Sequence, residues 1–419
     1  MACSIYYLTN IKTAMGHFAL ALILGLACAI FACSKSNEDA ICFDVMDYGA
    51  VCDGTTDDSQ AFFKAWNAAC SSETENPSII IPKQTFLVNP VVFRGPCKAK
   101  NINFLILGRV LAPDSPQAWE GLDPSQWLVF HGVSGLRVSG SGLIDGRGNG
   151  WWEQSCRDHP DLEGCTSLAP TALNLISCKR SSLKDIHFVN SSQTHVLIMG
   201  CDGMDIGNLM IQAPEISPNT DGIHIQASND VIISNITVGT GDDCISIGDS
   251  TSNIYISNVG CGPGHGISIG SLGKSGNMVQ VENIHVSKVY LKGTTNGVRI
   301  KTWQVGKGYV RGVTFKDLYF DSVENPIIID QNYCNIRGAC KELQSGVHIS
   351  DVVFINFYGT SSTDVAINLN CSRSVACTEI LLKSIQLTSA SIGHTLTSNC
   401  TNAFGYTFGM VQPQPCLQI

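Results

Sequence analysis

Short apolar runs separated by polar turns recur along the chain from about residue 136 onward. One run spans residues 183–190, and similar units begin near Met204, Val231, Ile254, Ile284, Val313 and Val352. A repeat of roughly 20 to 40 residues is typical of a solenoid. Strands of roughly four to six residues joined by Asn or Gly turns favour a parallel β-helix. The pattern therefore predicts an all-β solenoid.

An antiparallel β-sandwich would also contain many short strands. Here, however, the runs are mainly apolar and do not strictly alternate with polar residues, which is typical of buried parallel strands. Few Asn-Gly or Asp-Gly pairs, the usual hairpin turns, lie between the runs. Both features favour the solenoid over the sandwich.

A helical spacing of apolar residues occurs at residues 57–70. Its apolar positions are Ala61, Phe62, Ala65, Trp66 and Ala69. Either of two adjacent aspartates, Asp57 and Asp58, would cap this helix. We expect it to cover the N-terminal end of the solenoid, where strand edges would otherwise be exposed. Since no linker is recognisable, we expect residues 35–135, the cap and first coils, to form one domain with the body of the solenoid at 136–419.

Residues 1–34 have the pattern of a secretion signal. Lys12 is the one charge before Lys35, and an apolar run extends from Phe18 to Phe31 before small residues that end at Ser34. The apolar run is short for a membrane span of about 20 residues. This favours cleavage over a retained anchor, so we expect a mature chain without membrane attachment.

The cysteine content indicates the same compartment. Of 19 cysteines, three lie in the signal and sixteen follow it, too many for a reducing cytosol. Close pairs could form small loops, although sequence alone does not fix their connectivity; they are Cys156/Cys165, Cys334/Cys340 and Cys371/Cys377. No pair has the spacing of a structural zinc site. Four glycosylation sequons, at Asn190, Asn235, Asn370 and Asn399, complete the expectation of a secreted, extracellular glycoprotein.

The formal net charge of the chain is −9 at pH 7. This charge argues against nucleic acid as a partner and against general electrostatic capture of a polyanion. An anionic substrate would therefore need a local cluster of positive charge.

Three aspartates and one histidine follow each other at intervals of one coil. Asp221 precedes Asp242 by 21 residues, and Asp243 precedes His265 by 22. Residues on adjacent coils would stack about 4.8 Å apart. Aspartate is common in turns, but adjacent carboxylates repel each other. In an extended stretch Asp242 and Asp243 would point to opposite sides, so one of them would face a groove. Such crowding raises one pKa, which provides the acid and the bases that glycoside hydrolysis requires.

Further along the chain lie residues suited to an acidic sugar. His265 lies between two glycines; such a His is usually a turn residue, but here the missing side chains would let a polymer approach. Arg299 and Lys301 share one strand face. Two such cations are often merely solvated, yet in register with three aspartates they predict a clamp for a substrate carboxylate. Tyr333 could stack on a sugar ring or simply pack.

Taken together, these segments resemble the plant-type polygalacturonases of glycoside hydrolase family 28. The matching motifs are Asn219-Thr220-Asp221, Gly241-Asp242-Asp243, Gly264-His265-Gly266 and Arg299-Ile300-Lys301, with the N-terminal block Phe43–Ala50 and the segment Gly142–Gly148. The resemblance extends from Cys42 to about Cys416. No motif position departs from the family pattern.

The resemblance implies a right-handed parallel β-helix that hydrolyses α-1,4 bonds between galacturonic acid units of de-esterified homogalacturonan, a pectic polysaccharide. It implies inversion at the sugar carbon, with no metal or other cofactor. We expect a monomer that acts in the cell wall, with endo action favoured over exo.

The resemblance also assigns roles to residues. Asp242 would be the general acid, while Asp221 and Asp243 would activate the water. Arg299 and Lys301 would hold the substrate carboxylate. His265, Tyr333 and Asn219 would complete the site, and a disulfide between Cys244 and Cys261 would brace the catalytic coils.

Some alternatives remain open at this point. Stacked coils place carboxylates about 5 Å apart, as in retaining enzymes, whereas inverting pairs are roughly 6.5–9.5 Å apart; here we follow the resemblance. A pectate lyase would need a Ca²⁺ site of several carboxylates, which His265 and Lys301 oppose. A wall-binding adhesin would not need an intact acid–base set, and rhamnogalacturonan or xylogalacturonan are alternative substrates.

Overall fold

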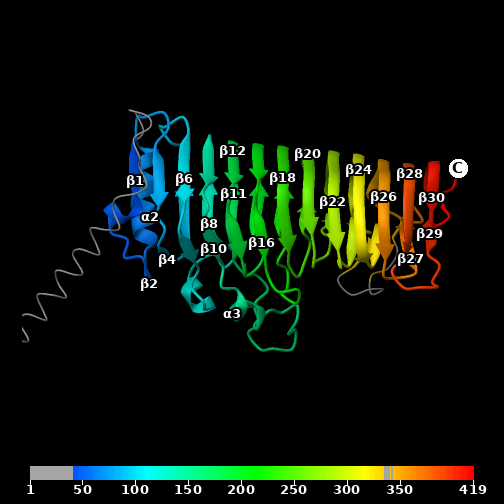
Figure 1. Cartoon of the computed structure of the whole chain (residues 1–419), viewed down its shortest axis with the longest axis horizontal. Coiled ribbons are helices and arrows are strands. Elements are labelled where there is room, and N and C mark those ends of the chain that lie inside the picture. Colours follow the sequence, from blue (N-terminus) through cyan, green and yellow to red (C-terminus); the bar gives the residue numbers. More distant parts are fainter. Residues whose placement is uncertain (1–40, 335–339, 341–342) are drawn as a thin grey trace, which may run out of the picture.

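The computed structural model describes residues 41–334, 340 and 343–419, so the expected signal at 1–34 lies outside the described residues. The chain winds into an elongated stack of β-coils (Figure 1). All pairings between its named strands in the described residues are parallel, for example β14 with β17. The predicted all-β parallel solenoid is confirmed. None of the helices in the described part is both long and apolar enough to cross a membrane.

One face of the solenoid is an 11-stranded sheet, here named the front sheet. Its strands follow each other coil by coil, and neighbouring strands are hydrogen bonded. In order they are β5 (Val91–Arg94), β8 (Gln126–His131), β11 (Thr171–Ile176), β14 (Val196–Met199), β17 (Ile223–Gln226), β19 (Ile245–Ile247), β21 (Ile267–Leu272), β23 (Asn296–Trp303), β25 (Asn325–Tyr333), β27 (Val365–Asn370) and β29 (Thr397–Thr401).

The other 19 strands form the back of the solenoid. In the first coils they make two columns of short strands. The first column is β1 (Cys42–Asp44), β3 (Ser78–Ile81), β6 (Ile102–Ile106), β9 (Leu136–Ser139), β12 (Lys179–Lys184) and β15 (Asp202–Gly207). The second is β2 (Asp53–Asp57), β4 (Thr85–Leu87), β7 (Arg109–Leu111), β10 (Leu143–Asp145), β13 (His187–Val189) and β16 (Met210–Gln212).

From β18 onward each coil has one long bent strand that spans both columns. Accordingly, β18 pairs with β15 through one half and with β16 through the other. These strands are β18 (Asn229–Gly239), β20 (Thr251–Cys261), β22 (Met278–Lys292), β24 (Lys307–Val323), β26 (His348–Ser361), β28 (Cys377–Ser389) and β30 (Ala403–Gln412).

The bend in these strands explains the polar residues between the apolar runs. Asn235 and Asn258 occupy the same corner on neighbouring coils, with φ of 55° and 56°. Asparagine tolerates this left-handed conformation better than most residues. The Asn258 side-chain amide also donates to the Asn235 side-chain oxygen at 3.2 Å, so the corner residues bond to each other along the stack.

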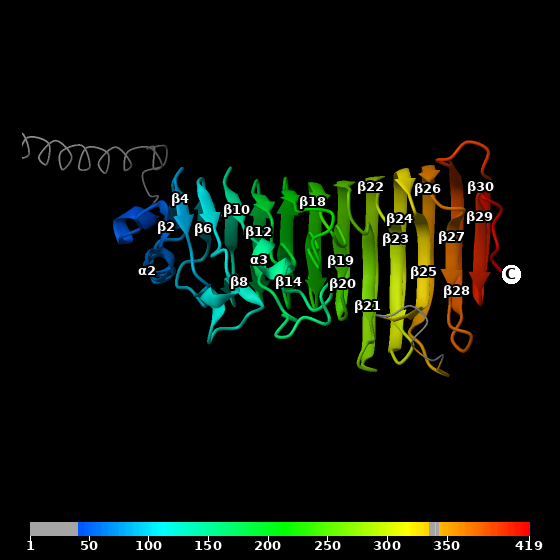
Figure 2. The same ribbon diagram turned by 90° about the horizontal axis from the view of Figure 1, so that it is seen from below.

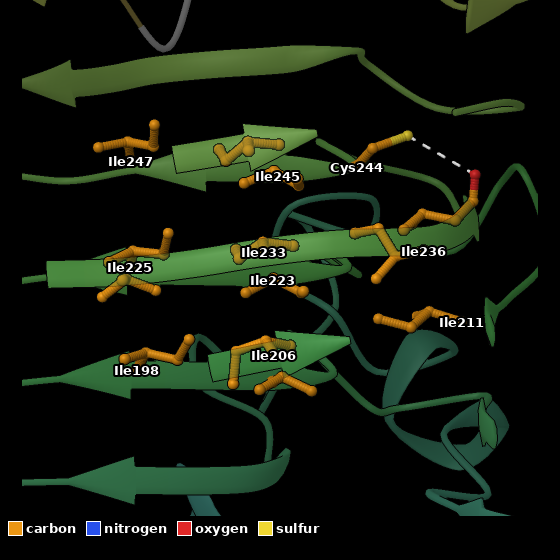
Figure 3. Packing of buried hydrophobic residues seen from close by; sticks show 14 of the residues in the cluster. Ile198, Ile206, Ile211, Ile223, Ile225, Ile233, Ile236, Cys244, Ile245 and Ile247 are labelled. Carbon is orange, nitrogen blue, oxygen red and sulfur yellow. Dashed lines mark hydrogen bonds between the residues drawn. The ribbon is translucent and has the colours of Figure 1, made fainter. Parts of the chain in front are cut away.

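The apolar positions that begin the predicted repeats form a single row. Met204, Val231, Ile254, Ile284, Val313 and Val352 are register partners on consecutive strands of the back, and all are buried. On the front sheet, Ile198, Ile225 and Ile247 stack in the same way (Figure 3). Because a slip of one residue would turn such a row outward, the core determines the register of each coil.

The predicted N-terminal helix is also confirmed. Helix α2 (Ser59–Cys70) lies at the N-terminal end of the stack (Figures 1 and 2). Asp58 is its N-cap residue, and the Asp57 carboxylate accepts the Ser59 backbone N–H at 2.9 Å. Trp66 is fully buried and donates its indole N–H to the Arg94 carbonyl at 3.1 Å, which holds the helix against the first coils.

Strand pairing crosses the expected boundary at residue 135 without a break, since Ile102 of β6 is the register partner of Leu136 of β9. Three short helices complete the described secondary structure: η1 (Val45–Tyr48), η2 (Pro116–Trp119) and α3 (Asn149–Trp152).

The expected disulfides are all present. They are Cys156–Cys165, Cys334–Cys340, Cys371–Cys377 and Cys244–Cys261, and two further bridges join Cys70–Cys97 and Cys400–Cys416. Cys178 and Cys201 are buried thiols outside these bridges.

Candidate active site

The aspartates and the histidine of the motifs lie where neighbouring coils enter the front sheet. Asp221, Asp243 and His265 each come two residues before β17, β19 and β21. Ile223 pairs with Ile245 and Ile245 with Ile267, so the three entry turns lie one above another. Backbone bonds keep them in place: the Gly222 N–H donates to the Asp243 carbonyl at 2.9 Å.

Asp243 is surrounded by groups from the front sheet. One carboxylate oxygen accepts from the Ser268 hydroxyl at 2.7 Å and from the Arg299 guanidinium at 2.8 Å. The other accepts from the Lys301 ammonium at 2.8 Å. The Asp243 and Lys301 side chains are only 2% and 9% exposed. The structure therefore brings Arg299 and Lys301 together with an aspartate, as their shared strand face predicts.

Asp242 is held differently. One oxygen lies 2.9 Å from the His265 Nδ1 atom and also accepts the Asp243 backbone N–H. The other accepts from the Arg157 guanidinium at 2.6 Å. Residues 241–244 form a bend and not a strand, so both carboxylates reach one cluster. The expectation that Asp242 and Asp243 point to opposite sides is therefore wrong.

The charges around Asp242 and Asp221 act in opposite directions. Burial alone would raise the pKa of Asp242, but the hydrogen bond and charge of His265, together with Arg157, outweigh it and lower that pKa. Burial raises the pKa of Asp221 well above its usual range, and the neighbouring carboxylates Asp242 and Asp243 add to the effect. One carboxyl of the cluster has a raised pKa, as expected, but it is Asp221 and not Asp242.

Two polar side chains connect Asp221 to the front sheet. The Ser246 hydroxyl donates to the Asp221 carboxylate at 2.6 Å. On its other side, Ser246 lies 2.7 Å from the Nδ1 atom of His224. Burial lowers the pKa of His224, which favours the neutral ring at this position.

A second histidine holds the backbone of Asp221. The carbonyl of Asp221 accepts both the backbone N–H of His195 at 2.8 Å and its Nδ1–H at 3.1 Å. The Nε2 atom of His195 accepts the Ser191 N–H at 3.3 Å. His195 is fully buried, and burial lowers its pKa to about 4. This neutral imidazole therefore fixes the entry turn of β17.

One of the glycines beside His265, Gly266, has a steric reason in the fold itself. A Cβ at Gly266 would lie 2.1 Å from the carbonyl oxygen of Asn296 on the next coil. Gly266 also has a φ of +80°, a region that side chains disfavour. The close approach of two coils therefore requires this glycine, and the approach of a polymer to His265 stays a prediction.

Two expected substrate contacts lie outside the carboxylate cluster. Tyr333 ends β25, packs edge-on against Trp303 and lies with its ring centroid 5.6 Å from the Lys301 ammonium. It lines a cleft of about 550 Å³ together with Asn325 and Asn370. Asn219 is exposed and lines a separate small cavity of about 20 Å³. Tyr333 therefore borders the cluster through Lys301, whereas Asn219 lies at the separate cavity.

Several residues of the site carried no recognisable signal in the sequence. Ser246 and Ser268 are ordinary strand residues, yet register places them beside Asp221 and Asp243. Arg157 precedes Asp242 by 85 residues and belongs to a loop. Its position directly after Cys156 was the one available hint, because a disulfide-closed loop holds its neighbours in place.

The cluster could in principle be considered for a metal ion. One ligand atom from each of Asp242, Asp243 and His265 lies within 4.8 Å of the others. However, Arg157 contacts Asp242, and Arg299 and Lys301 contact Asp243. Three cations already neutralise the two carboxylates, so this donor set is poorly suited to Ca²⁺.

The four sequons differ in their surroundings. Asn235 and Asn399 are exposed, whereas Asn190 and Asn370 are half-buried. The Asn370 amide donates to the Asp330 carboxylate at 3.4 Å within the cleft beside Tyr333. Glycosylation at all four sites stays a prediction, with Asn235 and Asn399 the more accessible.

Solved structures with the same architecture support the fold. An endo-xylogalacturonan hydrolase from Aspergillus tubingensis superposes with a TM-score of 0.75 at 24% identity, over 88% of this chain and 98% of that one. A polygalacturonase from Erwinia carotovora superposes with a TM-score of 0.71, also at 24% identity, over 90% and 99%. At these identities the likeness concerns the fold.

Closer relatives come from plants. Polygalacturonase QRT2 of Arabidopsis thaliana is 42% identical over 372 residues, which cover 88% of this chain and 83% of that protein. A polygalacturonase of Prunus persica is 40% identical over 403 residues, which cover 96% and 98%. The sequence profile of the glycosyl hydrolases family 28 matches residues 70–408. The chain is thus a glycoside hydrolase and belongs to family 28.

Proposed function

We propose that this protein is a secreted polygalacturonase that hydrolyses α-1,4-galacturonosidic bonds of de-esterified homogalacturonan in the cell wall. The observation that carries the proposal is the convergence of Arg157, Arg299 and Lys301 on two adjacent aspartates. Such a local cluster of cations, in a chain with a net charge of −9, suits an anionic sugar polymer. The plant relatives described above are themselves named polygalacturonases.

Arg299 and Lys301 are the proposed clamp for the carboxylate of a galacturonate unit. The Lys301 ammonium has three N–H donors, of which one is directed to Asp243. The remaining donors of both side chains can bind a carboxylate through charge-assisted hydrogen bonds. Methyl esterification removes the negative charge of the sugar, so we expect much weaker action on highly methylated pectin.

The proposed chemistry uses the three aspartates as acid and bases. Asp242 gives a proton to the glycosidic oxygen as the bond from C1 to that oxygen breaks. Water adds to C1 from the opposite face and transfers its proton to Asp221 or Asp243, which inverts C1. Because the carboxylates influence each other's titration, each limb of the pH profile of activity reports the cluster as a whole and not a single residue. We expect a maximum at mildly acidic pH, and a maximum above about pH 7.5 would contradict an acid of this kind.

Inversion needs its own test, because carboxylate oxygens of Asp242 and Asp243 lie within 4.8 Å of each other. That spacing is near the range of retaining enzymes. NMR of the first reducing sugar released from an oligogalacturonide identifies its anomer before mutarotation. A product with inverted configuration supports the proposal, and a retained one identifies a carboxylate as a nucleophile.

The main test of the function is digestion of polygalacturonic acid with sizing of the products over time. Early products of many lengths indicate the endo action that we favour, whereas steady release of one short product indicates exo action. Xylogalacturonan and rhamnogalacturonan are the comparison substrates. A calcium-dependent lyase would lose activity in excess chelator and form unsaturated products that absorb ultraviolet light.

Secretion and oligomeric state complete the proposal. N-terminal sequencing of the exported protein should place the first residue near position 35, and its mass by light scattering should be that of a monomer. Retention of residues 1–34 on the mature protein would contradict the cleaved signal.

A further inference from the structure

Arg157 reaches the site from a loop that is anchored at its base. Trp151 of helix α3 is buried and packs edge-on against Trp119 with centroids 5.4 Å apart. Beyond it, the Cys156 N–H donates to the Thr166 carbonyl at 3.0 Å, next to the Cys156–Cys165 disulfide. The segment after α3 projects from the body of the solenoid (Figure 1). Arg157 is thus the residue just beyond a rigid loop base.

The contact between Arg157 and Asp242 obstructs the role proposed for Asp242. One Asp242 oxygen is directed to His265, and the other accepts from Arg157 at 2.6 Å. A general acid must present its O–H to the glycosidic oxygen. Among the described residues, Arg157 is the partner of that second oxygen that comes from outside the coils. Asp242 can therefore meet the substrate once Arg157 has moved away.

Arg157 is also the most exposed of the three cations that contact the two aspartates. Its side chain is 43% exposed, against 14% for Arg299 and 9% for Lys301. Besides Asp242, the titratable groups that act on Arg157 are Asp158 and Tyr333. Those that act on Asp242 include His265, Arg157 and the nearby Asp221. Asp158 is exposed, so among the groups that act on Arg157 the buried carboxylate is Asp242.

A polyuronate supplies the carboxylate that could attract Arg157. Arg299 and Lys301 approach the aspartates from β23, the coil on the C-terminal side. Arg157 approaches from the segment between β10 and β11, on the N-terminal side. A polyuronate that lies along the coils has one carboxylate per unit, so it can present one carboxylate to β23 and another to the loop.

We propose that Arg157 is a specificity-determining residue: it closes on Asp242 in the free enzyme and transfers to the carboxylate of the sugar across the cleaved bond. This inference rests on the proposed function. This transfer would couple recognition to catalysis, because the uronate that binds Arg157 also draws it away from the acid Asp242. A sugar without that carboxylate, whether esterified or neutral, leaves Arg157 on Asp242.

The electrostatics of the free site agree with this role. Arg157 is one of the groups that lower the pKa of Asp242 in the absence of substrate. When the cation leaves, the pKa of Asp242 rises and protonation becomes easier. The pH profile of kcat/KM reports the free enzyme, whereas that of kcat reports the substrate complex. In the wild type, the upper limb of kcat should therefore lie at higher pH than that of kcat/KM.

The test compares Arg157→Gln and Arg157→Lys with a matched control, Arg137→Gln. Arg137 is an exposed residue of β9 on the back of the solenoid. With polygalacturonate, Arg157→Gln should lower kcat/KM about tenfold to a hundredfold and shift its upper pH limb to higher pH. It should also narrow the preference for polygalacturonate over methyl-esterified pectin. Arg157→Lys should keep the limb of the wild type, and Arg137→Gln should change none of these quantities.

Three outcomes would count against the inference. One is an upper pH limb of kcat/KM that is the same in Arg157→Gln as in Arg137→Gln. If Arg157→Gln lowers the melting temperature without moving this limb, Arg157 has only a structural role. Another is that the pH profiles of kcat and kcat/KM of the wild type have their upper limbs at the same pH. This measurement does not depend on the folding of any variant. A third is an unchanged preference for de-esterified substrate. If the wild type does not hydrolyse polygalacturonate at all, the proposed function itself has failed.

Discussion

The two adjacent aspartates of the site are held by two different parts of the molecule. Asp243 is held by Ser268, Arg299 and Lys301, which all come from strands of the front sheet; we name this group the sheet half. Asp242 is held on its open side by Arg157 of the disulfide-closed loop; we name this pair the loop half. Neighbours in sequence therefore have unrelated supports.

The difference shows how one site combines rigidity with response. In the sheet half, the register of buried isoleucines determines where each polar side chain lies. A shift there would disturb the core of several coils. In the loop half, one exposed side chain can change partner without disturbing the core. Charge in the sheet half is therefore permanent, whereas charge in the loop half can depend on the ligand.

The largest expected effect concerns Asp242 itself. Asp242→Asn keeps the volume of the side chain but removes the proton that the leaving oxygen needs. General acid–base groups typically contribute about 10² to 10⁴ in rate, and we expect kcat on polygalacturonate to fall by that factor. Asp230→Asn is the matched control, because Asp230 is an exposed corner residue on the back with φ of 55°. An Asp242 variant within a few-fold of wild type would remove the acid from this position.

The next effect concerns His195, which holds the backbone of Asp221, and the stability of the protein in acid. The pKa of His195 is about 4 in the folded protein, against about 6.5 when exposed. Below pH 6.5 the unfolded chain binds a proton that the folded chain does not, so the free energy of unfolding falls as the pH decreases towards 4. The loss amounts to about 3 kcal/mol. Urea unfolding of wild type and His195→Gln between pH 7 and 4 measures it.

That experiment compares how steeply the free energy of unfolding depends on pH in the wild type and in the variant, because other groups also titrate between pH 7 and 4. Asp221, with its raised pKa, contributes in the opposite sense: its burial costs stability as the pH rises. The His195 variant should show a flatter dependence on pH than the wild type. Equal slopes would mean that His195 does not stay neutral in the fold.

A third test compares the two halves in stability. Lys301→Met removes a charged hydrogen bond between two buried side chains, and we expect the free energy of unfolding to fall by about 2 kcal/mol. Arg157→Gln removes a cation that is 43% exposed, for which we expect less than about 1 kcal/mol. Thermal or urea unfolding of both variants measures the two losses in the free energy of unfolding. Equal losses would show that the loop half is as structural as the sheet half.

The smallest effect concerns the loop disulfide. Cys156→Ser with Cys165→Ser loosens the loop that presents Arg157, while the front sheet is unchanged. We expect kcat/KM on polygalacturonate to fall by less than in Arg157→Gln. In the Arg157→Gln background the same double change should have no further effect, because residues that act through one another are not additive. If removal of the disulfide lowers kcat/KM in the Arg157→Gln background as much as in the wild type, the loop acts independently of Arg157.

Much of the fold could be predicted from local pattern. The rows of buried residues on the back begin at the same positions as the apolar repeats, such as Val231 and Ile254. The motif residues Asp221, Asp243 and His265 lie on consecutive coils because their spacing equals the coil length. The shared face of Arg299 and Lys301 follows from the two-residue period of a strand.

The charge state of the site could not be predicted in this way. Whether Asp242 or Asp221 carries the raised pKa depends on burial and on cations that are distant in sequence, such as Arg157 at 85 residues. The expected direction of the Asp242 side chain was wrong for a related reason. Residues 241–244 bend as they enter β19, so their side chains do not alternate as they would in a strand.

The sequence by itself determined the solenoid, the capping helix and the candidate catalytic residues, because the period of apolar residues and the length of a coil are local properties of the chain. Tertiary structure alone decided that a loop cation contacts Asp242 and that Ser246 and His195 hold Asp221. The physical reason is that hydrogen bonds and Coulomb interactions depend on distances in space, and coil stacking brings together residues that no local pattern connects.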